Sequence, residues 1–230
     1  MITTDFIRDG MVIDPAILQE IVGRAVASNF GDYPDQAANF LGNIGLPDGR
    51  VVGSFVRHAV DGIIHDPFDH VVLITRTYNP GVGLKALPGG LIDPIQKIDG
   101  RMVAEKALIA TFREATQETN ISERVLRNAR VIPLGHRLFE RPFDVRVAWR
   151  DMEGTDIKKG DLVLISTQGF SVMTQEDLSK IPLKAGDDAD AAAGVHVDKI
   201  SELKPEQFGI ADHLPMIRAA KLAAGWFSLS

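Results

Sequence analysis

The sequence predicts an α/β (or α+β) fold in which a mixed sheet packs between helices, and two observations carry that prediction. Short apolar runs alternate with amphipathic stretches along the chain, which is the pattern of strands and helices that pack in layers. Hydrophobic residues make up 45% of the chain and charged residues 24%, as expected for a globular domain with a true core. With 230 residues, the chain is long enough for one large domain or for a domain with an extension.

Residues 1–50 are expected to form a short helical N-terminal extension before the main domain, residues 51–230. Asp14 and Pro15 make a favourable helix start, because the Asp side chain caps the first turn and proline fits the first helical position. Apolar residues then recur at helical spacing, and a second short helix is expected over residues 35–41. No side chains here have catalytic spacing, so the extension is expected to serve packing or to contribute to a homodimer.

Apolar runs bounded by turn residues predict the strands of the main domain. The turn at residues 65–69 contains aspartate and proline and separates two of these runs. A later segment, residues 139–143, places aromatic residues beside an arginine and is expected to interrupt the sheet. Strands are expected over residues 51–52, 55–64, 71–75, 129–134, 145–149, 162–165 and 195–197.

Charge and composition exclude several classes of function. The net charge is −6, so the chain has no basic footprint for a nucleic-acid backbone, and any phosphate must be met by local cations. The absence of cysteine excludes disulfides and thiolate metal sites and fits a reducing compartment. We see neither a basic-then-apolar leader nor an apolar run of membrane-spanning length, so we expect a cytoplasmic protein without a membrane partner.

Residues 104–119 are the most informative stretch, because they predict a helix with carboxylates beside an apolar stripe. Glu114 and Glu118 are four residues apart and therefore neighbours on one flank of that helix, and Gln117 lies next to them. Two such acids repel one another, and a cation between them turns the repulsion into attraction. Oxygen ligands suit a hard ion such as Mg²⁺, with Mn²⁺ as an alternative. The competing interpretation is an ordinary surface helix with a solvated acidic face.

This stretch resembles the signature of the Nudix hydrolases, in which Glu, seven residues and Arg-Glu precede a further pair of acids. Here Glu105 is followed by seven residues and then by Arg113-Glu114, and Glu118 and Ile121 stand in register. The upstream segment LPGG, preceded by two apolar runs, is also similar to the family. The resemblance covers about residues 56–223 and implies a Nudix-type α/β/α sandwich with a mixed sheet.

Three positions depart from the family pattern. Gln117 stands where the first Glu of the Glu-Glu pair belongs, which removes a charge from the implied metal site. Asn120 replaces the closing glycine, a mild change because Asn tolerates the left-handed conformation at a helix end. The opening glycine is out of register, since Asp99 occupies its position and Gly89-Gly90 lie upstream, which implies a loop insertion of roughly nine residues.

The resemblance also implies roles for individual residues. Glu105 and Arg113 are expected to pair and to support the loop against the helix. Arg76, at the end of a predicted strand, is expected to face substrate phosphates, although a plain surface cation explains it equally well. Phe139 and Arg141 are expected to line the substrate pocket, with ordinary loop packing as the alternative. The implied metal ligands are Glu114, Gln117, Glu118 and a backbone carbonyl in the glycine turn at Gly90.

The C-terminal part resembles the end of ADP-ribose pyrophosphatases and of the related domain fused to nicotinamide mononucleotide adenylyltransferases. A Gly-Asp-Asp-Ala loop at residues 186–189 precedes a last strand, and Asp212-His213 opens the last helix. In this branch the general base can come from the late loop, so Asp187 and Asp188 are the candidate bases. Local roles are the alternative, since Asp favours turns and helix caps and His213 commonly packs or bonds locally.

The implied activity is Mg²⁺-dependent hydrolysis of the diphosphate bond of a nucleoside diphosphate linked to another moiety. ADP-ribose, cleaved to AMP and ribose 5-phosphate, is the favoured small-molecule substrate. NADH is disfavoured, because the aromatic-proline signature of NADH-specific members does not follow the motif. The alternative function is a nucleotide-binding sensor or partner module that has kept the pocket and lost turnover, and Gln117 is its main support.

Overall fold

The computed structural model describes residues 14–28, 36–77, 81–98, 101–144, 155–158, 160–186 and 189–223. The chain divides into two compact units, each built from three segments. Unit 1 comprises residues 1–58, 91–106 and 137–167, and unit 2 comprises residues 59–90, 107–136 and 168–230.

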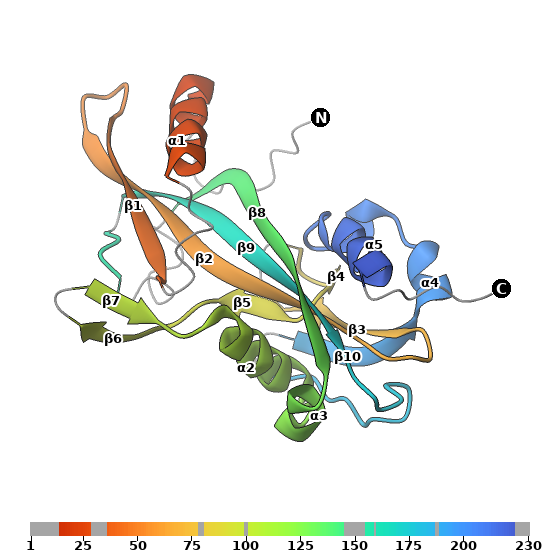
Figure 1. The fold of residues 1–230 in the computed structure, drawn as a ribbon. Coiled ribbons are helices and arrows are strands. Elements are labelled where there is room, and N and C mark those ends of the chain that lie inside the picture. The colour runs from red at the N-terminus through yellow and green to blue at the C-terminus, as the bar shows by residue number, and fades with distance from the viewer. Residues whose placement is uncertain are drawn as a thin grey trace. The chain divides into compact units, whose positions relative to one another are not determined.

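Figure 1 labels the elements along the chain. The described helices are α1 (Pro15–Ala27), α2 (Ala107–Thr119), α3 (Glu123–Arg127), α4 (Val197–Ser201) and α5 (His213–Ala223), with a 3₁₀ turn, η3 (Pro205–Gln207). The described strands are β1 (Ala38–Gly45), β2 (Val51–His65), β3 (His70–Arg76), β4 (Lys85–Ala86), β5 (Gly89–Leu91), β6 (Pro94–Ile98), β7 (Arg101–Ala104), β8 (Arg130–Asp144), β9 (Leu162–Met173) and β10 (Ala189–His196).

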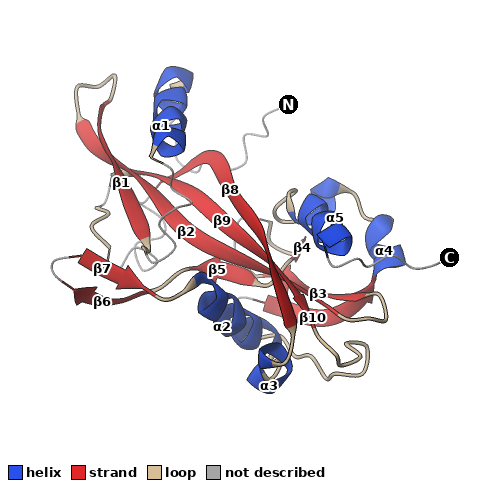
Figure 2. Ribbon diagram, viewed as in Figure 1, coloured by secondary structure: helices blue, strands red, loops and turns tan. Residues whose placement is uncertain are grey.

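Within the described part of the chain, eight strands form one sheet, and β6 and β7 form a separate two-stranded sheet (Figure 2). In the large sheet, β10, β3, β2, β9 and β8 are hydrogen-bonded neighbours in that order. β1 and β5 pair with β2, and β4 pairs with β3. This mixture of strands and helices confirms the α/β class that the sequence predicts.

Helices of unit 2 cover both faces of its part of the sheet. A Cβ atom added at Gly62 of β2 would lie 3.0 Å from the Thr111 side chain of α2. The next residue, Ile63, is fully buried in a cluster that contains Leu214 and Ile217 of α5. Because successive residues of a strand point to opposite faces, α2 and α5 pack on opposite sides of β2. The layered arrangement expected from the sequence is therefore present in this unit.

Helix α1 begins as the sequence predicts. Asp14 caps it by accepting a hydrogen bond from the Ala16 N–H at 2.8 Å. The apolar side chains of Ile17, Ile21 and Ala25 are buried in a cluster with residues of β1, β2 and β9 in unit 1. The apolar face of α1 is therefore covered within its own unit, and it is not the unpaired surface from which a homodimer was inferred. The homodimer stays a prediction.

Two predictions of secondary structure are wrong. The second short helix does not form at residues 38–41, because these residues belong to β1, which pairs antiparallel with β2. The partner strand supplies backbone hydrogen bonds that the local pattern does not reveal. The interruption expected at residues 139–143 is also absent, since β8 runs through this segment to residue 144. The strand predicted at residues 145–149 lies outside the described residues.

The end of α2 confirms the interpretation of Asn120. This residue has φ of 55°, in the left-handed region, and its N–H donates to the Thr116 carbonyl oxygen at 2.9 Å. We expect Asn120→Ala to lower the free energy of unfolding by about 1 kcal/mol, because side chains other than Asn are strained in this conformation. Asn120→Gly should leave it unchanged within about 0.5 kcal/mol. Urea titration of both variants is the measurement, and equal stability of the two would contradict this account.

Candidate active site

Helix α2 turns a carboxyl group into the interior of unit 2. The residues of α2 that are buried recur at helical spacing, and Glu118 is one of them, with 5% of its surface exposed. The Glu114 side chain, one turn earlier, is 14% exposed. A buried carboxyl group on an apolar helix face is costly unless it is hydrogen-bonded or meets a cation. The predicted acidic flank is therefore packed against protein instead of being a solvated surface.

A backbone N–H meets the buried carboxyl group. The Gly89 N–H donates to Glu118 Oε2 at 2.9 Å, which joins the glycine turn to α2. A Cβ atom added at Gly90 would lie 2.6 Å from the Glu114 carboxyl carbon. A side chain at this position would have to displace the Glu114 carboxyl group, so glycine permits the close approach of the backbone. The structure thus brings the predicted LPGG turn to Glu114 and Glu118.

Without a metal ion, the environment of Glu118 favours the protonated form of its carboxyl group. The pKa of Glu118 is raised from 4.5 to about 8, with burial as the largest cause and the nearby Glu114 and Asp61 carboxyl groups acting in the same direction. The Gly89 N–H and the Arg76 guanidinium act in the opposite direction. A perturbed carboxyl group among other acids is typical of a functional site and of a place where a cation binds.

Arg76 lies at the end of β3, as the sequence predicts, and its positive charge acts on Glu118. Its Nε atom is buried and has no hydrogen-bond partner in the described structure. Buried donors are normally paired, so this group is available to an anionic ligand. The position fits the predicted contact with phosphate oxygens, which stays a prediction.

Gln117 lies on the exposed side of α2. Its Oε1 accepts a hydrogen bond from Arg113 Nη1 at 3.1 Å, and the same Arg113 nitrogen donates to Glu114 Oε1 at 2.7 Å. Arg113 thus orients two side chains of its own helix. The metal-ligand role of Gln117 stays a prediction.

Glu105, in the segment before α2, accepts a hydrogen bond at its Oε1 from the Asp93 N–H at 3.0 Å. Its expected pairing with Arg113 stays a prediction.

The late loop meets the C-terminal end of α2. The Gly186 N–H donates to the Glu118 carbonyl oxygen at 3.2 Å, and the Lys184 N–H donates to the Thr119 carbonyl oxygen at 3.0 Å. A Cβ atom added at Gly186 would collide with the Gln117 carbonyl oxygen, so this approach also requires glycine. The candidate bases Asp187 and Asp188 follow directly, but both lie outside the described residues, and the side chains of Phe139 and Arg141 lie outside the description too.

The structure adds two residues that the motif did not single out for this site. Asp61 of β2 is 5% exposed, and His213 at the start of α5 is fully buried. His213 Nε2 lies 3.3 Å from Asp61 Oδ2, and His213 Nδ1 accepts from the Leu87 N–H at 3.0 Å. Sequence reasoning named His213 in the C-terminal resemblance but expected a local role for it. Asp61 could have been found from the sequence, because it is an acid in the middle of an otherwise apolar predicted strand.

The group is suited to a hard divalent cation, because its donors are carboxylate oxygens in a largely buried setting beside a glycine turn. Such oxygen donors fit both Mg²⁺ and Mn²⁺.

None of the helices in the described part of the chain has the length and apolar character needed to cross a bilayer.

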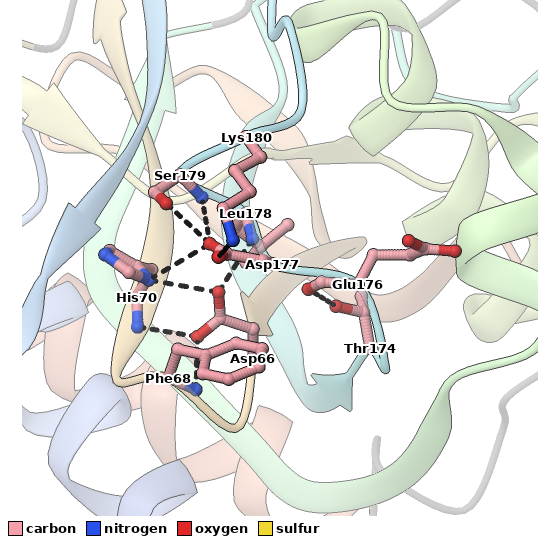
Figure 3. A network of polar contacts seen from close by, with 9 residues as sticks. All are labelled: Asp66, Phe68, His70, Thr174, Glu176, Asp177, Leu178, Ser179 and Lys180. Carbon is pink, nitrogen blue, oxygen red and sulfur yellow. Dashed lines mark hydrogen bonds and ion pairs between the residues drawn. The ribbon is translucent and has the colours of Figure 1, made fainter.

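A second polar cluster in unit 2 involves Asp66, His70 and Asp177, whose potential ligand atoms lie within 4.8 Å of one another (Figure 3). The fully buried Asp66 carboxylate accepts hydrogen bonds from the backbone N–H groups of Phe68, His70 and Leu178. The Asp177 carboxylate is bound by the Lys180 ammonium group at 2.8 Å. These contacts tie the β2–β3 turn to the loop after β9, so the structure itself already uses these oxygens.

Comparison of the sequence with protein-family models and with curated proteins finds no match. Among solved structures, a bifunctional NMN adenylyltransferase/ADP ribose pyrophosphatase from Francisella tularensis, complexed with AMP and a Mn ion, is 17% identical, with a TM-score of 0.46. The match covers 91% of this chain and 47% of that one, so this chain spans about half the length of that enzyme.

Two further solved structures bear the name of the family that the sequence resembles. The Nudix domain of Shewanella oneidensis NrtR, complexed with ADP ribose, is 18% identical, with a TM-score of 0.45 and coverage of 73% of this chain and 87% of that one. RenU, a Nudix hydrolase from M. smegmatis, is 16% identical, with a TM-score of 0.46 and coverage of 82% of this chain and 98% of that one.

The raised pKa of Glu118 predicts how stability depends on pH when no metal is present. Between pH 4.5 and about 8, the folded protein keeps a proton that the unfolded chain has lost, so Glu118 lowers the stability progressively as pH rises through this range. Glu118→Gln removes this effect and should make the protein more stable than wild type at pH 8, by on the order of 1–3 kcal/mol.

Urea unfolding at pH 5 and pH 8 in the presence of a chelator measures this difference. The matched control is Glu123→Gln on α3, because Glu123 is 63% exposed and pairs only with the exposed Arg127 in the contacts described for it. The control should follow the wild-type pH dependence. Identical pH dependence of wild type and Glu118→Gln would mean that Glu118 ionises normally.

Proposed function

We propose that the protein is a metal-dependent hydrolase that cleaves the diphosphate bond of a nucleoside diphosphate linked to another moiety. The observation that carries this proposal is the buried Glu118 carboxyl group, held by the Gly89 N–H and close to Glu114 and the Arg76 guanidinium. Acids gathered around a glycine turn, with a cation that has a free donor at the edge, form a site that can receive both a metal ion and phosphate oxygens.

A bound Mg²⁺ or Mn²⁺ ion supplies positive charge to the diphosphate oxygens and lowers the pKa of a bound water molecule. In this proposal Glu114 and Glu118 hold the ion, with Gln117 and the backbone at Gly90 as further ligands. Arg76 binds a phosphate oxygen through its unpaired Nε and offsets the charge that develops in the transition state.

The proposed general base comes from the late loop. Gly186 is hydrogen-bonded to the end of α2, and Asp187 and Asp188 follow it in the chain. A carboxylate at either position accepts the proton of the attacking water. Phe139 and Arg141 are proposed to line the pocket for the nucleoside or ribose, and Glu105 with Arg113 to support the loop before α2.

ADP-ribose is the substrate that we favour, cleaved to AMP and ribose 5-phosphate. This choice rests on the sequence resemblance of residues 186–213 to the end of ADP-ribose pyrophosphatases. Residues 51–230 are proposed to form the hydrolase domain and residues 1–50 its extension. The burial of Glu118 favours catalysis over a passive surface, since an ordinary acidic helix face would be solvated.

Incubation with ADP-ribose, NADH, sugar nucleotides and nucleoside triphosphates, each with Mg²⁺ or Mn²⁺, tests the proposal. We expect AMP to be released from ADP-ribose in a reaction that a chelator stops. Glu118→Gln should lower the rate by about 100-fold or more while it keeps the fold, and Glu123→Gln should not change it. Turnover of the Glu118→Gln variant at the wild-type rate would mean that the metal does not bind at Glu118. Binding without any turnover would favour the sensor function.

Gln117→Glu tests whether position 117 belongs to the metal site. If Gln117 is a ligand, the added charge should tighten metal binding and lower the Mg²⁺ concentration that gives half-maximal rate. Without metal, the repulsion from Glu114 opposes the attraction of Arg113, which already donates to position 117 at 3.1 Å, so stability should change by less than about 0.5 kcal/mol. Metal titration of the rate and chelated urea unfolding separate these effects. An unchanged or higher half-saturating concentration would place Gln117 outside the metal site.

A further inference from the structure

The backbone of the glycine turn is bonded to α5, β2 and α2. The Leu87 N–H donates to His213 Nδ1 at the start of α5, at 3.0 Å, in a buried contact. The Pro88 carbonyl oxygen accepts from the Gly62 N–H of β2 at 2.8 Å. The next N–H, that of Gly89, reaches the buried carboxyl group of α2. Because a buried backbone N–H needs an acceptor, the His213 ring supplies what the first residue of the turn requires.

Asp61 lies behind the His213 ring, on the same face of β2 as Ile63, which packs with α5. Its Oδ2 atom is 3.3 Å from His213 Nε2, and the two side chains are 8% and 0% exposed. Its other oxygen borders the turn, because a Cβ atom added at Gly89 would collide with Asp61 Oδ1. The pair thus contacts the turn twice, through His213 at Leu87 and through Asp61 at Gly89.

The bond to Leu87 fixes the tautomer of His213. Because Nδ1 accepts a hydrogen bond, it carries no proton, and the proton of the neutral ring is on Nε2, which faces the Asp61 carboxylate. The other tautomer would turn an Nδ1–H against the Leu87 N–H and the bare Nε2 against the carboxylate. The negative charge of Asp61 therefore selects the form of the ring that the turn needs.

The Leu87 bond bears on Glu118 through a short and partly rigid stretch of backbone. Pro88 fixes one backbone dihedral angle between Leu87 and Gly89, so a displacement of Leu87 is carried toward the Gly89 N–H. Gly89 and Gly90 have no such restriction, so contacts with their surroundings must define their conformation. The 2.9 Å hydrogen bond from the Gly89 N–H to Glu118 therefore depends on how the start of the turn is held.

We propose that Asp61 and His213 are positioning residues for the glycine turn. Asp61 keeps the His213 ring in the tautomer that accepts from the Leu87 N–H. This bond sets the place of the Gly89 N–H beside Glu118. Both side chains act through the backbone of the turn, and neither binds metal or substrate. The consequence for catalysis rests on the proposed function, which puts the reaction at Glu118.

The nitrogen chemical shifts of the His213 ring, measured by NMR at neutral pH without substrate or metal, report the tautomer directly. We expect the proton on Nε2, and the His213→Asn variant, which lacks these signals, assigns them. Asp61→Asn keeps the shape and removes the charge. It should raise the share of rings protonated on Nδ1 and speed hydrogen exchange of the Leu87 amide by about tenfold. A wild-type ring with its proton on Nδ1, or with both nitrogens protonated, would overturn the proposal.

Two substitutions separate the contact of His213 with the turn from its contact with Asp61. His213→Asn keeps an acceptor near the place of Nδ1, whereas His213→Gln keeps an amide near Nε2 and leaves the Leu87 N–H without an acceptor. With ADP-ribose at saturating Mg²⁺, we expect His213→Gln to lower kcat about tenfold and to change KM by less than about threefold, because the turn is misplaced while substrate contacts remain. The Leu87 and Gly89 amides should exchange about tenfold faster, and His213→Asn should stay within about threefold of wild type in each quantity.

Ile217→Val is the matched control for stability, because Ile217 lies one turn further along α5, is 4% exposed and belongs to the core of the same unit. This change removes a methyl group and lowers stability without altering a polar contact of the turn. Urea unfolding in chelator ranks the stabilities of all variants. Amide exchange and kcat that follow this ranking alone would make His213 a purely structural residue and overturn the proposal.

The outcomes separate this inference from the proposed function. If wild type hydrolyses ADP-ribose and His213→Gln does so with the wild-type kcat, the positioning role is wrong while the proposed function stands. If wild type hydrolyses no substrate, the proposed function fails, and the ring tautomer and the Leu87 exchange still decide whether the pair fixes the turn. Should His213→Gln not fold, Asp61→Asn provides the same measurements.

Discussion

The hydrogen bond from the Gly89 N–H to the Glu118 carboxyl group joins the glycine turn to helix α2 in a place largely closed to water. The glycine turn and Glu118 each depend on the other. Glycine at positions 89 and 90 lets the turn lie close to Asp61 and Glu114, which side chains at these positions would meet. Glu118 tolerates burial because it receives a hydrogen bond from the Gly89 N–H. The Arg76 charge acts on this carboxyl group, and the late loop docks on the backbone of the same residue, where the Gly186 N–H donates to the Glu118 carbonyl oxygen.

The arrangement of layers in unit 2 serves the same site from two directions. Helix α2 packs on one face of β2 through the small residue Gly62, and α5 packs on the other through Ile63. His213 begins α5 and reaches Leu87 at the start of the glycine turn. The turn is therefore bonded to α5 at Leu87 and to α2 at Gly89.

Stability and function oppose one another at this site. Glu114, Glu118 and Asp61 gather like charges in a poorly hydrated region, which costs folding free energy unless a cation or a proton is present. Natural proteins keep such crowding where binding or catalysis requires it. The Asp66 cluster is a useful contrast, because its buried carboxylate is satisfied by three backbone N–H groups and has a plain structural purpose.

Local sequence determined those features that depend on near neighbours. The capped start of α1 at Asp14, the helix that carries Glu114 and Glu118, and the left-handed Asn120 all follow from spacing or from one residue's conformational preference, and the structure confirms them. The α/β class followed from the alternation of apolar patterns. These features need no knowledge of what else the chain contacts.

Tertiary structure alone decided which distant residues meet. Residues 38–41 became a strand because β2 lies beside them, and β8 continued through an aromatic segment that seemed suited to a loop by its local pattern. Packing buried Glu118 and left Gln117 exposed, although both belong to the same motif on α2. Asp61 and His213 stand far apart in the chain, and only the packing of α5 against β2 brings their side chains to 3.3 Å. Periodicity reports which face of an element is apolar, whereas contacts between elements depend on how the whole unit packs.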